Sequence, residues 1–261
     1  MNNPKFRNVD PRSKSDQSHL DSTGIRWGSF DVEAIRSSSV DRARSRFRRH
    51  VPELIWNAAA LEGNTLPQAA VTALISGSNL DVVCQRDVDQ IIALSDAYNR
   101  LDELVASGEF EISKRVSDEL HSLLARHEAI ESGAFRGEGV VHGGGTVHLA
   151  NGGVVDGTEP GVGGELLRRR FEQIVSYVMT EEDPRRRALI YFASAVRHQF
   201  YFDGNKRTAR LMMTGVLLSA GFETVSVPFA RRLEYNEALD RLFAENDGTA
   251  LLRFLSTCSL A

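Results

Sequence analysis

Residues 197–210 read RHQFYFDGNKRTAR and lie between two apolar stretches, ALIYFASAV before them and LMMTGVLLSAG after them. The apolar stretches predict two buried helices, and Gly204 between them predicts a tight turn. Asn205 is a suitable N-cap for the second helix. Because the start of a helix presents unpaired backbone N–H groups and the positive end of the helix dipole, this turn predicts an anion-binding site.

The charged side chains around this turn indicate which anion the site would bind. Arg207 and Arg210 are three residues apart, so they lie on the same side of the second helix. Two guanidinium groups beside free amides suit phosphate groups better than a single carboxylate. Asp203 would repel phosphates unless a cation lies between them, and Mg²⁺ is the expected cation. The stretch therefore predicts a site for a di- or triphosphate together with Mg²⁺.

The remainder of the chain predicts an all-α domain with one β-hairpin. Apolar residues recur with helical spacing in further segments, at residues 40–63, 87–108, 113–130, 165–179 and 232–260. The glycine-rich residues 133–164 contain alternating pieces such as TVHL, which predict a β-hairpin flap at about residues 137–160. Residues 1–29 are polar, contain proline and lack helical periodicity, so we expect a flexible N-terminal arm before a domain at residues 30–261.

The overall composition limits the classes of partner. The 261 residues carry a net charge of −4, so attraction of the whole molecule to nucleic acid or to an anionic membrane is not expected. The chain has no apolar run of about 18 residues and no apolar signal core at its start, so we expect a cytoplasmic protein. Cys84 and Cys258 match no metal-binding spacing. His142 and His148, in the glycine-rich segment, lack the further ligands that a structural metal site needs.

The motif at residues 198–210 resembles the signature of Fic-domain proteins of the Fic/Doc family, usually written HPFx(D/E)GN(G/K)RxxR. GAFR at 133–136 is similar to the family's stretch ahead of its flap, and VSVPFARRLEYNEALDRLF at 225–243 is similar to its C-terminal helices. The resemblance covers roughly residue 30 to the end and implies a helical bundle with a β-hairpin flap. Most characterised members transfer AMP from ATP to a hydroxyl side chain of a target protein. The resemblance thus implies a protein adenylyltransferase that uses ATP and Mg²⁺, with an unidentified target protein docked on the flap and with homo-oligomerisation left open.

The family pattern also implies a role for each motif residue. The assignments are Mg²⁺ binding for Asp203, the phosphate-binding turn for Gly204, Asn205 and Lys206, and the outer phosphates for Arg207 and Arg210. The family's general base is a histidine six positions before the motif asparagine, and it accepts the proton of the attacking hydroxyl, a role that suits an imidazole.

This sequence departs from the family at the general base. The position six residues before Asn205 is Gln199, and His198 lies one residue earlier. Either a one-residue bulge places His198 in the catalytic position, or the chain aligns without insertion and Gln199 occupies it; the second register is favoured because an insertion beside a phosphate turn is geometrically expensive. Adjacent helical residues point about 100° apart, so the two cannot serve the same site without a bulge. Glutamine has no useful basicity, and with Gln199 in this position the chain would be a non-catalytic nucleotide-binding protein that acts through partner contacts.

Lys206 keeps a second enzymatic alternative open. Many AMP-transferring members have glycine at this position, where a lysine would add a phosphate ligand. Doc-type members, which use ATP as kinases, resemble this sequence in having lysine there. A Doc-like kinase is therefore the alternative to the adenylyltransferase among the enzymatic interpretations.

Glu62 indicates an inhibitor within the chain itself. Ala58-x-x-x-Glu62-Gly63 resembles the family's inhibitory segment, written (S/T)xxxE(G/N), on a helix at about residues 50–63. In the family this glutamate pairs with the second motif arginine and blocks the ATP γ-phosphate, so the resemblance implies a Glu62–Arg210 ion pair and autoinhibition. Ala58 lacks the family's hydroxyl, and the loss of one hydrogen bond worth about 1 kcal/mol implies a looser clamp.

Overall fold

The computed structural model describes residues 11–78 and 84–260. Its elements in chain order are α1 (Pro11–Thr23), α2 (Val40–Ala60), α3 (Gln68–Ile75), α4 (Gln85–Ser107), α5 (Lys114–Leu124), β1 (Thr146–His148), β2 (Val154–Asp156), the 3₁₀ turn η1 (Val162–Gly164), α6 (Glu165–Val178), α7 (Pro184–His198), α8 (Asn205–Ser219), the 3₁₀ turn η2 (Phe229–Arg231), α9 (Arg232–Glu245) and α10 (Thr249–Ser256). The predicted all-α fold with one β-hairpin is confirmed.

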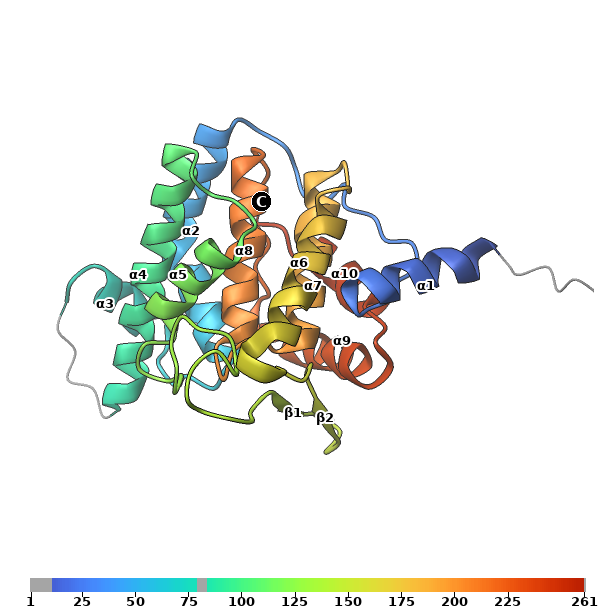
Figure 1. The fold of residues 1–261 in the computed structure, drawn as a ribbon. Helices are drawn as coiled ribbons and strands as arrows, with labels where there is room; N and C mark the ends of the chain where they lie inside the picture. The colour runs from blue at the N-terminus through green and yellow to red at the C-terminus, as the bar shows by residue number, and fades with distance from the viewer. Residues whose placement is uncertain (1–10, 79–83, 261) are drawn as a thin grey trace, which may run out of the picture.

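Helices α7 and α8 form the centre of the domain (Figure 1). Most of their side chains are buried, in agreement with the two apolar stretches that encode them. A helix that is apolar on all sides has to be surrounded by other elements. Accordingly, α8 packs against α2, α4 and α5 as well as against α7, while α7 also contacts α6, α9 and α10. The start of α8, which carries the motif, is thus held by the core of the domain.

The chain turns after α7 at Gln199, which adopts a backbone conformation that is more typical of glycine. Helix α7 ends at His198, and Gln199 follows in the left-handed region with a φ of 53°, which is uncommon for a residue with a Cβ atom. The buried Arg136 stabilises this reversal: its Nε donates a hydrogen bond to the Gln199 carbonyl at 2.7 Å, and its backbone N–H donates to the Phe200 carbonyl at 2.8 Å. Arg136, the last residue of the GAFR stretch, therefore stabilises the turn between α7 and α8.

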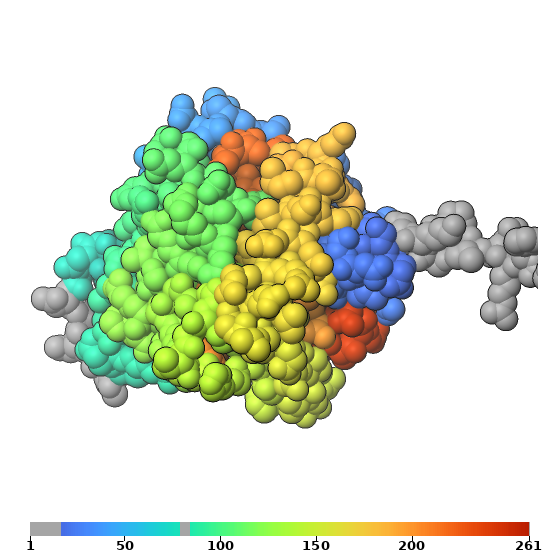
Figure 2. Space-filling model, viewed as in Figure 1, coloured from blue at the N-terminus to red at the C-terminus, as the bar shows by residue number. Residues whose placement is uncertain are grey.

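The hairpin flap is shorter than the predicted 137–160. Its two strands pair antiparallel, with Thr146 opposite Asp156 and His148 opposite Val154. The Gly157 N–H donates to the Gly145 carbonyl at 2.9 Å and extends the pairing by one step. Figure 1 shows the hairpin at the end of the bundle where α7 leads into α8. In Figure 2 the glycine-rich segment forms one continuous surface with α5 and α6.

The predicted flexible arm at residues 1–29 is corrected by the structure for residues 11–29, while residues 1–10 lie outside the described part of the chain. Helix α1 lies against α6 in both Figures 1 and 2. Ile25 and Trp27, which follow α1, are 0% and 5% exposed, and the Trp27 ring stacks on His19 with 4.2 Å between ring centroids. These apolar residues are isolated in the sequence, so no periodicity identifies them. Only packing against α6 and the start of α10 makes them core residues.

Within the described residues, no helix combines the length and the apolar character needed to cross a bilayer.

Replacement of Ile25 tests whether the N-terminal segment belongs to the core. Ile25→Ala removes a fully buried side chain and is expected to lower the free energy of unfolding by about 2–5 kcal/mol in urea denaturation. The matched control is Ile130→Ala, the same change at a side chain that is 69% exposed, which should stay within about 0.5 kcal/mol of wild type. Equal stabilities of the two variants would show that residues 24–29 form a loose arm after all.

Candidate active site

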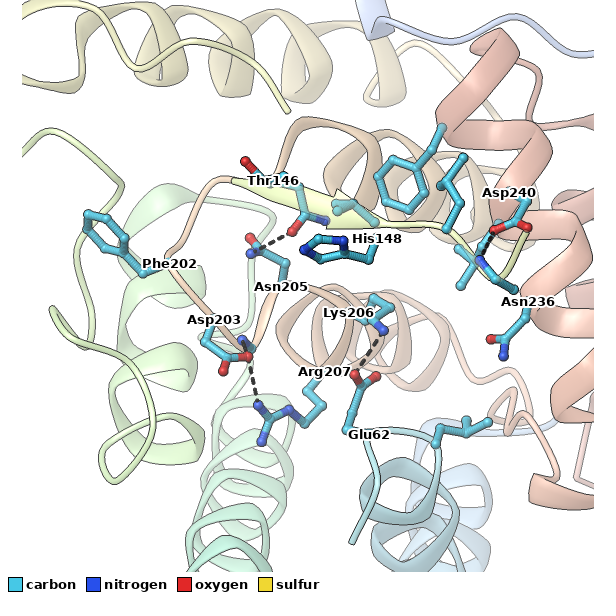
Figure 3. Close-up of a pocket in the computed structure, with 18 residues that line it drawn as sticks. Glu62, Thr146, His148, Phe202, Asp203, Asn205, Lys206, Arg207, Asn236 and Asp240 are labelled. Carbon is cyan, nitrogen blue, oxygen red and sulfur yellow. Dashed lines mark hydrogen bonds and ion pairs between the residues drawn. The ribbon is translucent and has the colours of Figure 1, made fainter. Parts of the chain in front are cut away.

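A cavity of about 470 Å³ opens at the start of α8 (Figure 3). Its volume lies in the range of small-molecule sites. Four parts of the chain line it: the turn into α8 with the first residues of that helix, strand β1 with the two residues after it, the turn after α2, and one face of α9. The lining residues with polar or charged side chains are Glu62, Thr146, His148, Gln199, Asp203, Asn205, Lys206, Arg207, Asn236 and Asp240.

The floor of the cavity is an uncapped helix start. The predicted N-cap, Asn205, is instead the first residue of α8, and Gly204 with a φ of 73° precedes it. The Asn205 side chain folds back over the turn: its Oδ1 accepts the Tyr201 N–H at 2.8 Å, and its Nδ2 donates to the Tyr201 carbonyl at 2.7 Å and to the Gln199 Oε1 at 3.1 Å. No side chain caps the first turn of α8 among the described residues. Its N–H groups therefore remain available to an anion.

His198 does not line the cavity. Its side chain is buried on the other side of the turn, where Nε2 lies 2.9 Å from the Thr23 carbonyl and Nδ1 lies 2.5 Å from the Thr158 hydroxyl. Because a carbonyl only accepts hydrogen bonds, Nε2 carries the proton and Nδ1 accepts from Thr158. Burial lowers the pKa of His198 to about 3, so the ring is neutral at neutral pH. Both ring nitrogens are thus engaged away from the cavity.

Gln199 lines the cavity where the general base of the family motif would stand. Its Oε1 accepts from Asn205, and its Nε2 donates to the Val196 carbonyl at 2.7 Å. Gln199 has a left-handed conformation directly after α7. Gln199 therefore lines the cavity, while the imidazole of His198 lies outside it.

Glu62 pairs with Lys206 rather than with the predicted Arg210. The Lys206 Nζ lies 2.8 Å from Glu62 Oε2. Lys206 and Arg210 share one face of α8, one turn apart, and the turn after α2 that carries Glu62 reaches the residue nearer the helix start. Burial favours the neutral acid, but the charges of Lys206, Arg207 and Arg210 outweigh it and hold the pKa of Glu62 below its usual value. Glu62 is thus an anion inside the predicted phosphate site.

Arg210 lies behind this pair and does not line the cavity. Its side chain is buried, and its Nη2 donates to the Tyr235 hydroxyl at 3.4 Å. Its Nε and Nη1 have no hydrogen-bond partner in the described part of the chain, and neither has Oε1 of Glu62. Unsatisfied buried polar atoms are costly, so these atoms are free to form hydrogen bonds with a water molecule or a ligand.

Arg207 is committed to carboxylates in the core. Its Nη1 pairs with Glu128 and its Nη2 lies 3.2 Å from the Asp203 Oδ1. The side chains of Arg207 and Glu128 are 3% and 5% exposed, and Gln90 Nε2 donates to Glu128 Oε1 at 2.6 Å. Glu128 was not among the predicted site residues, because only the packing of α8 near the end of α5 brings it to Arg207. The guanidinium of Arg207 is therefore engaged by carboxylates rather than directed into the cavity.

Asp203 is the residue that could hold a metal ion. Its side chain is 53% exposed at the cavity, and its Oδ1 accepts the Gly204 N–H at 2.5 Å. Residues 11–78 and 84–260 contain no group of three or more His, Cys, Asp and Glu side chains that could enclose a metal. Mg²⁺ commonly binds one or two carboxylates together with substrate phosphates. A single accessible carboxylate beside a phosphate site fits that pattern.

Two elements contribute residues that the sequence did not single out for the site. On β1, Thr146 and His148 lie on the same face of the strand, two positions apart, and Figure 3 shows both beside Asn205. On α9, the Asp240 carboxylate accepts the backbone N–H groups of Ala150 and Asn151 at 3.0 and 3.2 Å. The alternation in TVHL indicated the strand, but nothing in the sequence indicated that its polar face lies over the α8 start.

Comparison with known proteins finds relatives that are similar in sequence. The chain is 26% identical over 245 residues to the protein adenylyltransferase Fic of Drosophila willistoni and 27% identical over 248 residues to that of Drosophila erecta, in each case over 90% of this chain and 46% of the relative. It thus spans about half the length of these curated relatives. No protein-family model matches the chain.

Two solved structures share the fold. The first is a Fic domain containing signalling protein from Bacteroides thetaiotaomicron, with a TM-score of 0.68 and 18% identity over 95% of this chain and 92% of that one. The second is Fic-1, residues 134–508, from C. elegans, with a TM-score of 0.66 and 22% identity over 94% of this chain and 68% of that one. The chain is thus similar in sequence to Fic adenylyltransferases and shares the fold of Fic-domain structures.

The buried histidines predict how stability depends on pH. Burial lowers the pKa of His198 to about 3 and that of His121, whose Nδ1 accepts the Gly133 N–H, to about 4. An unfolded histidine has a pKa near 6.5, so below that pH the unfolded chain binds protons that the folded chain does not. The free energy of unfolding therefore decreases as the pH falls from about 6.5, by up to about 1.4 kcal/mol per pH unit for each histidine.

His198→Gln isolates one of these two contributions. Between pH 6 and pH 5 its free energy of unfolding, measured in urea, should fall less steeply than that of wild type by about 1 kcal/mol per pH unit. His142→Gln, at an exposed position in the glycine-rich segment, is the matched control and should keep the wild-type slope. A wild-type slope in His198→Gln would mean that His198 is not held neutral by burial.

Proposed function

We propose that this chain is a protein adenylyltransferase that binds ATP with Mg²⁺ in the cavity and transfers AMP to a hydroxyl side chain of a target protein. The observation that carries the proposal is the uncapped start of α8 at the floor of a cavity of about 470 Å³. Free N–H groups at a helix start are a common phosphate-binding device. The names of the Drosophila relatives supply the class of reaction.

The charges around the α8 start support binding of more than one phosphate. Lys206 is a cation at the cavity wall, where phosphate oxygens would accept charge-assisted hydrogen bonds from it. Arg210 is buried behind Lys206, and its positive charge would add to the attraction without direct contact. Asp203 would hold Mg²⁺ beside the phosphates, and the ion would offset the repulsion between the carboxylate and the phosphate oxygens.

Glu62 would act as the inhibitor of this site. Its ion pair with Lys206 occupies a cation that phosphates need, and its charge repels them across a partly desolvated cavity. At 4 Å and an effective dielectric constant near 20, such a repulsion is about 4 kcal/mol. Opening of the Glu62–Lys206 pair is therefore a condition for tight ATP binding. The target protein would dock on the flap by strand addition, the usual way in which a β-edge binds an extended peptide.

A non-catalytic nucleotide-binding protein is the second candidate function. This candidate is favoured by the placement of two adjacent residues. Gln199 lines the cavity, whereas His198 is buried and both of its ring nitrogens form hydrogen bonds outside the cavity. A general base usually contributes about 10²–10⁴-fold to a rate, and an amide cannot supply it. A protein of this kind would bind ATP and act through partner contacts alone.

Replacement of Glu62 tests the proposed function. Glu62→Ala removes the repulsive charge and frees Lys206, so the affinity for ATP with Mg²⁺, measured by titration calorimetry, should rise at least about tenfold, or about 1.4 kcal/mol. Glu33→Ala, at a carboxylate that is 77% exposed, is the matched control and should bind like wild type. Absence of ATP binding in all three proteins would contradict the nucleotide site itself.

The reaction is then read from the position of a radioactive label. Each protein is incubated with Mg²⁺ and ATP labelled at the α- or at the γ-phosphate, and covalent label on protein is counted. Label from the α-phosphate, stronger in Glu62→Ala than in Glu33→Ala, is the expected result for an inhibited adenylyltransferase. Label from the γ-phosphate alone would assign the Doc-like kinase reaction that Lys206 left open. Tight binding without any label would favour the non-catalytic candidate.

A further inference from the structure

We infer that His148 on the flap is the proton acceptor for the attacking hydroxyl, in place of the motif histidine that this site lacks. The inference rests on the proposed adenylyl transfer. The motif residues provide no general base at the cavity. Gln199 occupies the position where the motif has its histidine, and the His198 ring lies outside the cavity. His148 is the histidine among the cavity-lining residues of the described chain.

The His148 ring points into the cavity. Figure 3 shows it between Asn205 and Lys206, above the start of α8. The side chain is exposed, and its ring nitrogens make no hydrogen bond to another residue in the described ranges 11–78 and 84–260. An imidazole that is accessible and has a free nitrogen can accept a proton from a group that enters the cavity.

The hairpin that carries His148 is held at its turn and at its base. Beyond the strand, the Asp240 carboxylate on α9 accepts the N–H groups of Ala150 and Asn151. At the base of the hairpin, the Thr158 N–H donates to the His198 carbonyl at 3.0 Å. These contacts fix β1 over the α8 start, and the alternation of the strand then directs His148 inward. A catalytic base needs such positioning, because its reach to the proton is only about 3 Å.

The other ionisable groups that line the cavity already have partners. Glu62 is paired with Lys206, Asp203 with Arg207 and with the Gly204 N–H, and Asp240 with the flap. A carboxylate that accepts hydrogen bonds and ion pairs is a weaker base than a free one. Lys206 and Arg207 are cations and donate rather than accept. His148 is therefore the group at the cavity best placed to take a proton from an incoming hydroxyl.

The target hydroxyl oxygen attacks the α-phosphorus of ATP and forms a P–O bond, and the bond between the α-phosphorus and the oxygen that bridges to the β-phosphate breaks. Pyrophosphate leaves, and the hydroxyl proton passes to a ring nitrogen of His148. Because His148 belongs to the flap on which we propose that the target docks, the base lies on the same element as the incoming hydroxyl.

The test compares two histidines of the glycine-rich segment in the full chain. Glu62→Ala serves as the background, and His148→Ala or His142→Ala is added to it; His142 is exposed and does not line the cavity. Covalent label from α-labelled ATP, by self-modification, should decrease about 10²–10⁴-fold with His148→Ala and stay unchanged with His142→Ala. Titration calorimetry should give the same dissociation constant for ATP in all three proteins.

The pH dependence separates a base from a structural role. An imidazole accepts a proton only when it is neutral, so the labelling rate of the background protein should fall toward acidic pH. The residual rate of His148→Ala should lack this acidic limb, whereas a variant with a merely distorted flap would keep it.

Each other outcome overturns the inference in a distinguishable way. Equal labelling of the two variants would remove His148 from the reaction and leave the proposed transfer intact. A loss of ATP binding in His148→Ala would make His148 a nucleotide ligand instead of the base. Tight ATP binding with no label in the Glu62→Ala background would refute the adenylyl transfer, and the role of His148 with it.

Discussion

The side chain of Asn205 is the constraint on which the site depends. One planar amide accepts the Tyr201 N–H, donates to the Tyr201 carbonyl and donates to the Gln199 side chain. These bonds set the length of the turn, because an added residue would move at least one partner out of hydrogen-bond range. The turn therefore places Gln199 at the cavity and excludes His198 from it. Because the Asn205 side chain forms its hydrogen bonds within the turn, it does not cap the first N–H groups of α8.

His198 has a structural role: it connects segments of the chain that are distant in sequence. Its ring joins three segments that are distant in sequence: the end of α1 at Thr23, the residues after the flap at Thr158, and the end of α7. Gly24 is packed so closely on the ring that an added Cβ atom would lie 2.3 Å from it. The N-terminal segment is thereby linked to the base of the flap through a neutral histidine.

The cations of the site are balanced by carboxylates from other parts of the chain. Lys206 has Glu62, and Arg207 has Glu128 and Asp203. Buried charges without partners cost several kcal/mol, so these carboxylates stabilise the cations of the site. Glu62 differs from Glu128 in that it lines the cavity, so under the proposed function Glu62 would compete with a nucleotide while Glu128 would remain in the core.

The central pair of helices, the turn between them and the hairpin could be predicted from the sequence, because each of these follows from local periodicity or from glycine. Only the tertiary structure decided which of two adjacent residues faces the cavity, that Lys206 rather than Arg210 meets Glu62, that Ile25 and Trp27 belong to the core, and that His148 lies over the α8 start. These features depend on contacts between segments far apart in the chain, and a pattern read along one segment contains no information about the surface that another segment will bring to it.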